Sequence, residues 1–538
     1  MASPAHKPAN SSAPHDGRRT LKADTLAASV VILLAVTVIQ RSVGFGRGIL
    51  FCRWLSPEVL GQWEMAYSFL LFAAPLAVLG VPGSFGRYAE HYRARGHLRT
   101  FLRRATAWTV GCAGIAMLLD VLLPGPMAVF VFGEADNAPV VRGMSLCLGA
   151  IILHHTVTSV LTALRLYRVV SAMNLVQSLL FAVVSLAMLW HGQSVSDIIA
   201  AYGAACLAAS LGALVWAWPG FRGLEPAVDA LPQREFWPKL LRFAFFLWVT
   251  NLLTHLFALV DRYMIIHCSG MSPAEALEQV GHYHSSRIVP LLLVSVADLL
   301  SGLIMPHLSH DWEAGRREYV SFRMALAVKL TSLGMLACGS AVLAAGPLLF
   351  GTVLQGRYDE GLAVLPWTLV GCMWYAVYSV SQNYLWCAER TRLSTAPLAC
   401  GLVVNVILNF MLLPMWGLLG AVVATAISTS VCLALSLALS RVHGMQVDRG
   451  VWIAAATPAA LVFGTAPALI ATAALILLAP TTSLVFSRAE RDKLKQLALD
   501  GLEKIRALPP ARRLPAGVRA IAPCPSESAD DVPCFLAP

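Results

Sequence analysis

The sequence contains little charge for its length. Of its 538 residues, 13% are charged, whereas soluble domains carry about a quarter. It contains no P-loop, no glycine-rich nucleotide motif and no residues at metal-ligand spacing, and its twelve cysteines form no CxxC pair. These absences argue against a soluble domain, an ATP-driven pump and a metalloenzyme, and they predict neither a metal site nor a bound cofactor.

Long apolar stretches take the place of the missing charge. Hydrophobic residues make up 57% of the chain, in runs of about 20 residues that are long enough to cross a bilayer. The sequence therefore predicts an all-α integral membrane protein with about fourteen transmembrane helices. The predicted spans are residues 26–50, 62–86, 106–132, 140–164, 169–190, 198–218, 240–266, 283–307, 324–350, 361–387, 393–414, 418–440, 451–466 and 468–486.

The net charge of +10 is distributed according to topology. Most of the lysines and arginines fall in alternate loops such as residues 87–104 and 310–323, whereas intervening loops such as residues 133–139 are nearly free of base. This asymmetry follows the positive-inside rule and predicts that both termini are cytoplasmic. Because topology explains the basic balance, no nucleic acid partner is expected.

Two hairpins repeat one pattern. The stretches "LSPEVLGQWEMAY" and "MSPAEALEQVGHYHSSR" both have "SP" followed by a glycine and an aromatic residue, and they place Gly61 and Gly281 220 positions apart. This spacing predicts two pseudo-symmetric six-helix halves plus a C-terminal hairpin. The predicted parts are a disordered cytoplasmic tail (1–24), the first half (25–218), a cytoplasmic linker (219–239), the second half (240–442), two extra transmembrane helices (451–486) and a basic, proline-rich cytoplasmic tail (487–538).

The motifs carry a family resemblance over roughly residues 25–445. The blocks "RWLSPEVLGQWEMAYSF", "LVDRYMI" and "NVILNFMLLPMWGLLGAVVATAIS" resemble bacterial polysaccharide and O-antigen flippases of the multidrug/oligosaccharidyl-lipid/polysaccharide exporter superfamily. The resemblance implies that the chain moves an undecaprenyl-pyrophosphate-linked oligosaccharide from the inner to the outer leaflet by alternating access. It also implies a location in the bacterial cytoplasmic membrane, among membrane lipids and other polysaccharide-assembly proteins.

Four arginines are the predicted substrate-binding residues. Arg41, Arg47, Arg262 and Arg287 lie inside predicted spans, where a fixed charge is costly unless it has an anionic partner. A guanidinium fork suits a pyrophosphate because it donates paired hydrogen bonds. The stretches "QRSVGFGRG" and "YHSSR" resemble lipid II flippases of the same superfamily, which implies that Arg47 and Arg287 line a central cavity.

Three intramembrane acids are predicted to serve as ion-coupling sites or salt-bridge latches. Asp261, Asp298 and Asp120 are candidates for coupling transport to H⁺ or Na⁺. The alternative left open by the sequence is that the arginines pair with Asp261, Asp298 or Glu64 only to hold helices together.

Two other functions compete with the flippase hypothesis. A membrane glycosyltransferase or polymerase needs surface acids on a sizeable external loop, but the longest predicted external segment, residues 268–282, holds only Glu275 and Glu278. The chain is therefore predicted not to be an enzyme. A multidrug extruder of the same superfamily is the nearer alternative; an acidic cavity would favour cationic drugs, and a basic cavity an anionic lipid-linked sugar.

Overall fold

The computed structural model describes residues 26–506 except 193, 224–230 and 480, and every regular element among them is a helix. The predicted disordered tail at residues 1–24 lies outside the described residues, as does the end of the predicted C-terminal tail from residue 507. The first half consists of α1 (Leu26–Trp54), α2 (Pro57–Ala77), α3 (Phe85–Arg93), α4 (Leu98–Leu122), α5 (Pro124–Phe132), α6 (Ala138–Ala163), α7 (Tyr167–His191) and α8 (Val195–Arg222).

The second half begins with two long helices that extend past their predicted spans. It consists of α9 (Gln233–Cys268), α10 (Pro273–Glu313), α11 (Arg317–Leu348), α12 (Asp359–Ser381), α13 (Asn383–Cys387), α14 (Thr391–Trp416) and α15 (Leu418–Val442). The chain continues with α16 (Arg449–Ala456), a 3-10 segment η4 (Thr457–Phe463) and α17 (Thr465–Leu478). Residues 487–538 form a separate unit, whose described part contains α18 (Arg488–Arg506).

The two "SP" motifs start equivalent helices. Ser56 caps α2 by accepting a hydrogen bond from the backbone N–H of Val59, and Pro57 occupies the first helical position. Ser272 does the same for α10, where Glu275 completes a capping box. The repeat seen in the sequence is therefore a repeated helix start.

Two predicted spans are interrupted by glycine or proline. The span at residues 62–86 is bent by 63° between α2 and a short 3-10 segment, η1 (Val81–Ser84), that leads into α3. Gly80 permits the bend because it adopts a left-handed conformation with φ of +70°. The span at residues 106–132 is divided into α4 and α5, where Pro124 starts the second helix.

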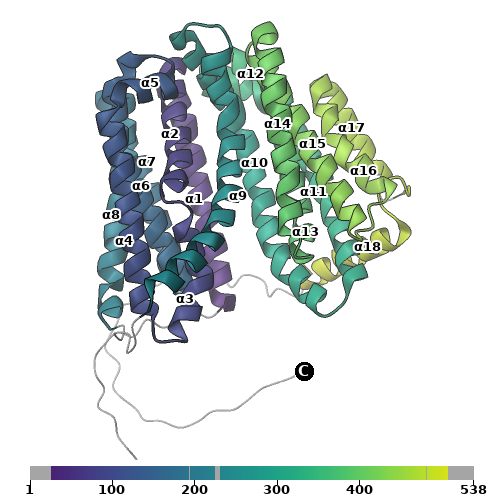
Figure 1. The fold of residues 1–538 in the computed structure, drawn as a ribbon. Coiled ribbons are helices and arrows are strands. Elements are labelled where there is room, and N and C mark those ends of the chain that lie inside the picture. Colours follow the sequence, from purple (N-terminus) through teal and green to yellow (C-terminus); the bar gives the residue numbers. More distant parts are fainter. Residues whose placement is uncertain (1–25, 193, 224–230, 480, 507–538) are drawn as a thin grey trace, which may run out of the picture. The chain divides into compact units, whose positions relative to one another are not determined.

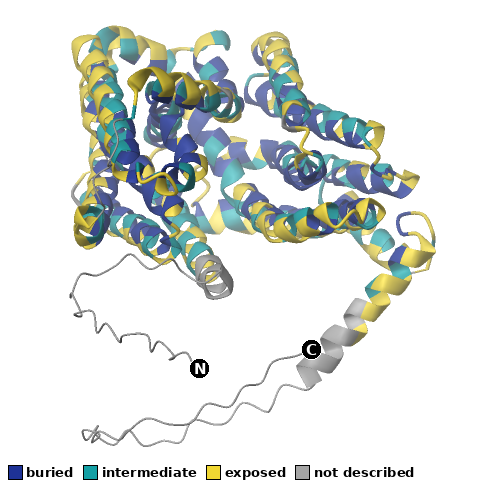
Figure 2. Cartoon of the chain, turned by 60° about the horizontal axis from the view of Figure 1, so that its bottom comes forward, coloured by how far each residue is buried: buried dark blue, intermediate teal, exposed yellow. Residues whose placement is uncertain are grey.

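Helices of each half pack mainly on their own half, and a few helices join the halves. Within the first half α1 packs on α7, and α4 and α8 both pack on α6; within the second, α12 packs on α10 and α15, and α14 on α15 (Figure 1). The contact between the halves is made chiefly by α2 with α10 and α9. Buried residues line the sides of helices that face other helices, whereas exposed residues lie on the outward sides (Figure 2). Since many of these exposed residues are large and apolar, the outward sides suit a lipid environment.

Ten helices among the described residues are long and apolar enough to cross a membrane, and the bent pair formed by α2 and α3 would be an eleventh. Helix α1 and two shorter apolar segments, Arg449–Phe463 and Thr465–Leu478, occupy the other predicted spans. The protein is thus a multi-pass helical membrane protein, as predicted. The number fourteen stays a prediction, since the two C-terminal segments are shorter than a full span.

Candidate functional site

The two halves meet most closely where α2 and α10 begin. A Cβ built on Gly61 would overlap the carbonyl group of Leu277, and a Cβ built on Gly281 would overlap that of Pro57. The contact is reciprocal: Gly61 and Gly281 are 220 positions apart, and so are Pro57 and Leu277. The equivalent glycines of the two repeats therefore face each other, and the missing side chains let the two backbones touch.

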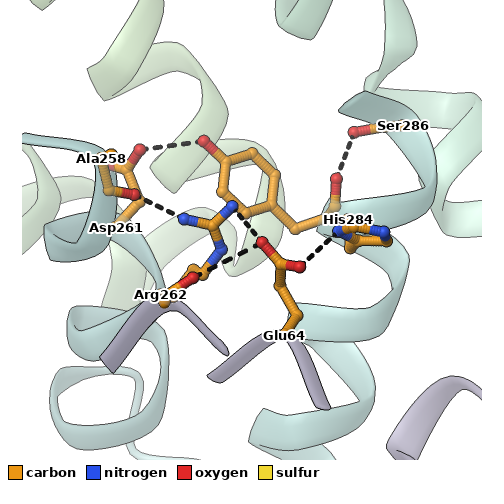
Figure 3. Close-up of polar contacts among 8 residues, drawn as sticks. Glu64, Ala258, Asp261, Arg262, His284 and Ser286 are labelled. Atoms are coloured by element: carbon orange, nitrogen blue, oxygen red, sulfur yellow. Dashed lines mark hydrogen bonds and ion pairs between the residues drawn. The ribbon is translucent and has the colours of Figure 1, made fainter. Parts of the chain in front are cut away.

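An ion-paired cluster lies directly beyond this contact and links the halves (Figure 3). Glu64 on α2 forms an ion pair with Arg262 on α9, with 2.5 Å between Oε1 and Nη2, and its Oε2 lies 2.9 Å from Nδ1 of His284 on α10. Glu64 and Arg262 are 5% and 4% exposed. The Nη1 of Arg262 also donates to the carbonyl oxygen of Ala258 at 2.5 Å. A buried pair of this kind resists separation, because removing one partner leaves an uncompensated charge.

Asp261 is held by four donors of the second half. Its Oδ2 accepts from the hydroxyls of Tyr283 at 2.9 Å and Thr425 at 2.6 Å, and its Oδ1 accepts from the amides of Asn405 at 2.9 Å and Asn409 at 3.0 Å. A carboxylate has about four lone-pair positions, so these donors engage all of them. Asp261 therefore ties α9, α10, α14 and α15 together and leaves no lone pair for a ligand.

Arg287 borders a small cavity of about 170 Å³ enclosed by α9, α10, α12 and α15. Its guanidinium lies 4.9 Å from the centre of the Tyr283 ring, and its buried Nη1 has no hydrogen-bond acceptor among the described residues. Asp261 lines the same cavity, but its oxygens are occupied. Of these two charged residues, Arg287 is therefore the one with an unused hydrogen-bonding group.

Arg47 on α1 does not line this cavity. Its guanidinium lies 4.1 Å from the centre of the Phe181 ring and 5.8 Å from that of Phe51, in the first half. Contact with aromatic faces partly compensates a cation in an apolar environment. Arg41, on the same helix, is exposed. The structure thus brings Arg262 and Arg287 together near the seam between the halves and leaves Arg41 and Arg47 on α1.

The two other predicted acids are apart from this cluster. Asp298 on α10 is exposed and lies within electrostatic reach of Arg41. Asp120, near the end of α4, is 4% exposed, and its Oδ2 has no partner among the described residues. Neither is part of an ion pair described for this chain.

A family model described as "Polysaccharide biosynthesis protein" matches residues 26–309, more than half of the chain. The chain belongs to this family. No curated protein sequence matches it.

Comparison with solved structures shows that the chain has the fold of the MurJ and MATE transporters. A lipid II flippase, MurJ, in an inward closed conformation matches with a TM-score of 0.63 at 13% identity, covering 88% of this chain and 97% of the other. An inward-facing multidrug resistance MATE family transporter matches with a TM-score of 0.62 at 12% identity, covering 78% and 100%. An outward-facing MATE transporter gives 0.50 at 15% identity, covering 77% and 95%.

Several residues of the site were not singled out from the sequence. His284 is 220 positions from Glu64, so the repeat that links Gly61 with Gly281 already contained this pair. Asn405 and Asn409 are four positions apart in "NVILN" and therefore share one helical face, a polar signal within an apolar helix. Their common acceptor could not be named, because it lies on a distant helix.

Proposed function

We propose that this protein flips a polyprenyl-diphosphate-linked oligosaccharide, of the undecaprenyl type, across the bacterial cytoplasmic membrane, with both termini in the cytoplasm. The observation that carries the proposal is Arg287, which lines the cavity and whose buried Nη1 has no hydrogen-bond acceptor among the described residues. An unsatisfied guanidinium N–H in such a place is costly, and a phosphate oxygen would satisfy it with a charge-assisted hydrogen bond. Asp261 has no free lone pair to offer a cation, whereas Arg287 keeps an unused N–H for an acceptor, which favours an anionic ligand over the cation expected for a multidrug extruder.

The cavity is smaller than the pockets that usually hold whole ligands, which measure about 300–1,000 Å³. It has room for a phosphate group but not for an oligosaccharide, so the halves must separate to admit the substrate. Arg262 would then leave Glu64 and bind the diphosphate instead. This change of partner would couple substrate binding to opening of the α2–α10 contact. In this scheme substrate phosphate and Glu64 compete for the same cations.

Coupling to H⁺ or Na⁺ requires a carboxylate whose oxygens are not all occupied by hydrogen bonds or ion pairs. The oxygens of Asp261 already accept four hydrogen bonds, whereas Asp298 and Asp120 each keep carboxylate oxygens that form no ion pair among the described residues. We therefore assign the coupling role to these two residues rather than to Asp261.

The proposal is tested by flipping of a fluorescent polyprenyl-diphosphate oligosaccharide in proteoliposomes. Arg287→Lys keeps the charge but loses the fork, and a lost charge-assisted hydrogen bond of about 1.5–3 kcal/mol lowers the rate about 10- to 150-fold. Arg53→Lys is the matched control, since Arg53 is exposed at the end of α1. An unchanged rate in both Arg287→Lys and Arg287→Ala, at normal protein abundance, would contradict the proposal. Transport of cationic dyes without flipping would favour the multidrug extruder.

A further inference from the structure

A groove lies within the first half, away from the charged seam. It has a volume of about 1,100 Å³ and is formed by α4 and α8, both of which pack on α6 (Figure 1). Its walls are almost entirely apolar, and several lining side chains are strongly exposed, among them Val110 at 68% and Leu146 at 73%. Apolar side chains on the outer surface of a membrane helix face acyl chains, so the groove opens toward lipid.

One end of the groove is basic. Arg99 and Arg103 lie four positions apart on the first turns of α4, hence on one face, and Arg222 lies at the last residue of α8. No carboxylate is among the lining residues, and none of these arginines forms an ion pair within the described part of the chain. The guanidinium of Arg222 lies 5.2 Å from the ring centre of Trp218, at the boundary between the basic end and the apolar walls. The charge-rule topology places this end on the cytoplasmic side.

We propose that this groove is a binding site for an anionic phospholipid of the cytoplasmic leaflet. The headgroup phosphate would accept from Arg99, Arg103 and Arg222, and the acyl chains would lie along the walls. Basic pockets between transmembrane helices at the cytoplasmic surface are suited to anionic headgroups such as that of cardiolipin. From Arg103 to Met117 the lining of α4 rises by 14 residue steps, or about 21 Å, which exceeds the roughly 15 Å of one hydrocarbon leaflet.

The position of the groove favours a resident lipid over the transported one. All three of its helices belong to the first half, so an occupant does not bridge the two halves and is not on the path that opens between them. The central cluster around Glu64 and Arg287 contributes no residue to its walls. The inference is therefore independent of the substrate proposed above.

The test is native mass spectrometry of the detergent-purified, delipidated full chain with added cardiolipin, phosphatidylglycerol or phosphatidylcholine. Cardiolipin and phosphatidylglycerol are expected to be retained in preference to phosphatidylcholine. Arg103→Gln and Arg222→Gln should each weaken anionic lipid retention about fivefold. Arg95→Gln is the matched control, because Arg95 is exposed in the neighbouring loop and does not line the groove.

A second variant tests the apolar part without touching the arginines. Gly114 lines the groove, and a Cβ built there meets no atom within 4 Å, so the side chain of Gly114→Leu starts in open space and adds bulk to the groove. Leucine also has a higher helix propensity than glycine, which protects the fold. Retention should fall in this variant although all three arginines remain.

Three outcomes would overturn the inference. They are equal retention of phosphatidylcholine and the anionic lipids, retention unchanged in the two arginine variants and in Gly114→Leu, and displacement of bound phospholipid by a polyprenyl phosphate. The last would make the groove a site for the transported lipid.

Discussion

Replacing Gly61 by alanine should open the closed side of the transporter. The added Cβ would overlap the backbone carbonyl of Leu277, and a carbonyl group cannot move aside as a flexible side chain can. Real Cβ atoms essentially never approach a heavy atom within 3.0 Å, so α2 and α10 must separate to accept the methyl group. The strain is confined to the conformation in which these helices touch.

The shift in the conformational equilibrium caused by Gly61→Ala depends on the strain being present in only one conformation. Overpacking a well-packed contact costs about 1–3 kcal/mol, and here the cost falls on the closed conformation alone. A differential of this size shifts a two-state equilibrium about 5- to 150-fold, toward the state with α2 and α10 apart. Gly281→Ala should have a similar effect, because its Cβ meets the carbonyl group of Pro57 in the same way.

The shift can be read by cysteine accessibility. Ser68 lies one turn beyond Glu64 on α2, with its hydroxyl 3.5 Å from the Glu64 carboxylate, so it lies behind the glycine contact. Ser68→Cys in a cysteine-free background should react slowly with an impermeant maleimide added on the side where α2 begins. Adding Gly61→Ala should raise the reaction rate within the range given above.

A control variant distinguishes separation of α2 from α10 from a general loss of helix packing. A Cβ at Gly46 on α1 meets no atom within 4 Å, so Gly46→Ala should leave the labelling rate unchanged. The reasoning would be refuted if Gly61→Ala, present at normal abundance in the membrane, reacted no faster than the parent protein.

Three further predictions concern buried polar contacts. Glu64→Gln leaves Arg262 without its carboxylate and should destabilise the closed state by about 3–5 kcal/mol, again seen as faster labelling at position 68; unchanged labelling would deny the ion pair a gating role. Asp448→Asn leaves the fully buried Lys329 without the carboxylate that it contacts at 2.8 Å, so thermal unfolding should occur at a clearly lower temperature, and an unchanged midpoint would count against the pair. Tyr283→Phe removes one donor to Asp261 but keeps the ring beside Arg287, so a loss of about 1.5–3 kcal/mol in stability is expected by denaturant titration, with no loss if the hydrogen bond is unimportant.

The sequence predicted those features that depend on local chemistry. The "SP" motifs, recognised in the sequence as a repeat, start two helices, because a serine cap and a proline at the first position act within one turn; the predicted spans began later, at residues 62 and 283. The spacing of Gly61 and Gly281 indicated a repeat, but the sequence could not show that the two glycines touch. That contact depends on how one repeat lies on the other, which no local pattern encodes.

Tertiary placement decided the roles of the charged residues. Asp261 and Arg262 are neighbours in the sequence, yet Asp261 is enclosed by donors of the second half whereas Arg262 reaches Glu64 of the first. Successive residues on a helix point about 100° apart, so adjacent charges meet different helices. The alternative that the arginines hold helices together describes Arg262, which pairs with Glu64, whereas substrate binding by Arg287 stays a prediction.

The seam also explains how two similar repeats can hold a charge at their contact. When two equivalent elements meet about a pseudo-twofold relation, each position near the axis faces its own counterpart. Identical glycines suit such a position, because both lack a side chain and allow close approach. Identical charges would repel, so a buried polar contact there requires the repeats to differ. Glu64 and His284 occupy equivalent positions and form such a complementary pair. The repeats therefore keep the same residue where the backbones touch and differ where a polar contact is buried, and this difference gives the contact between the halves a complementary pair of side chains.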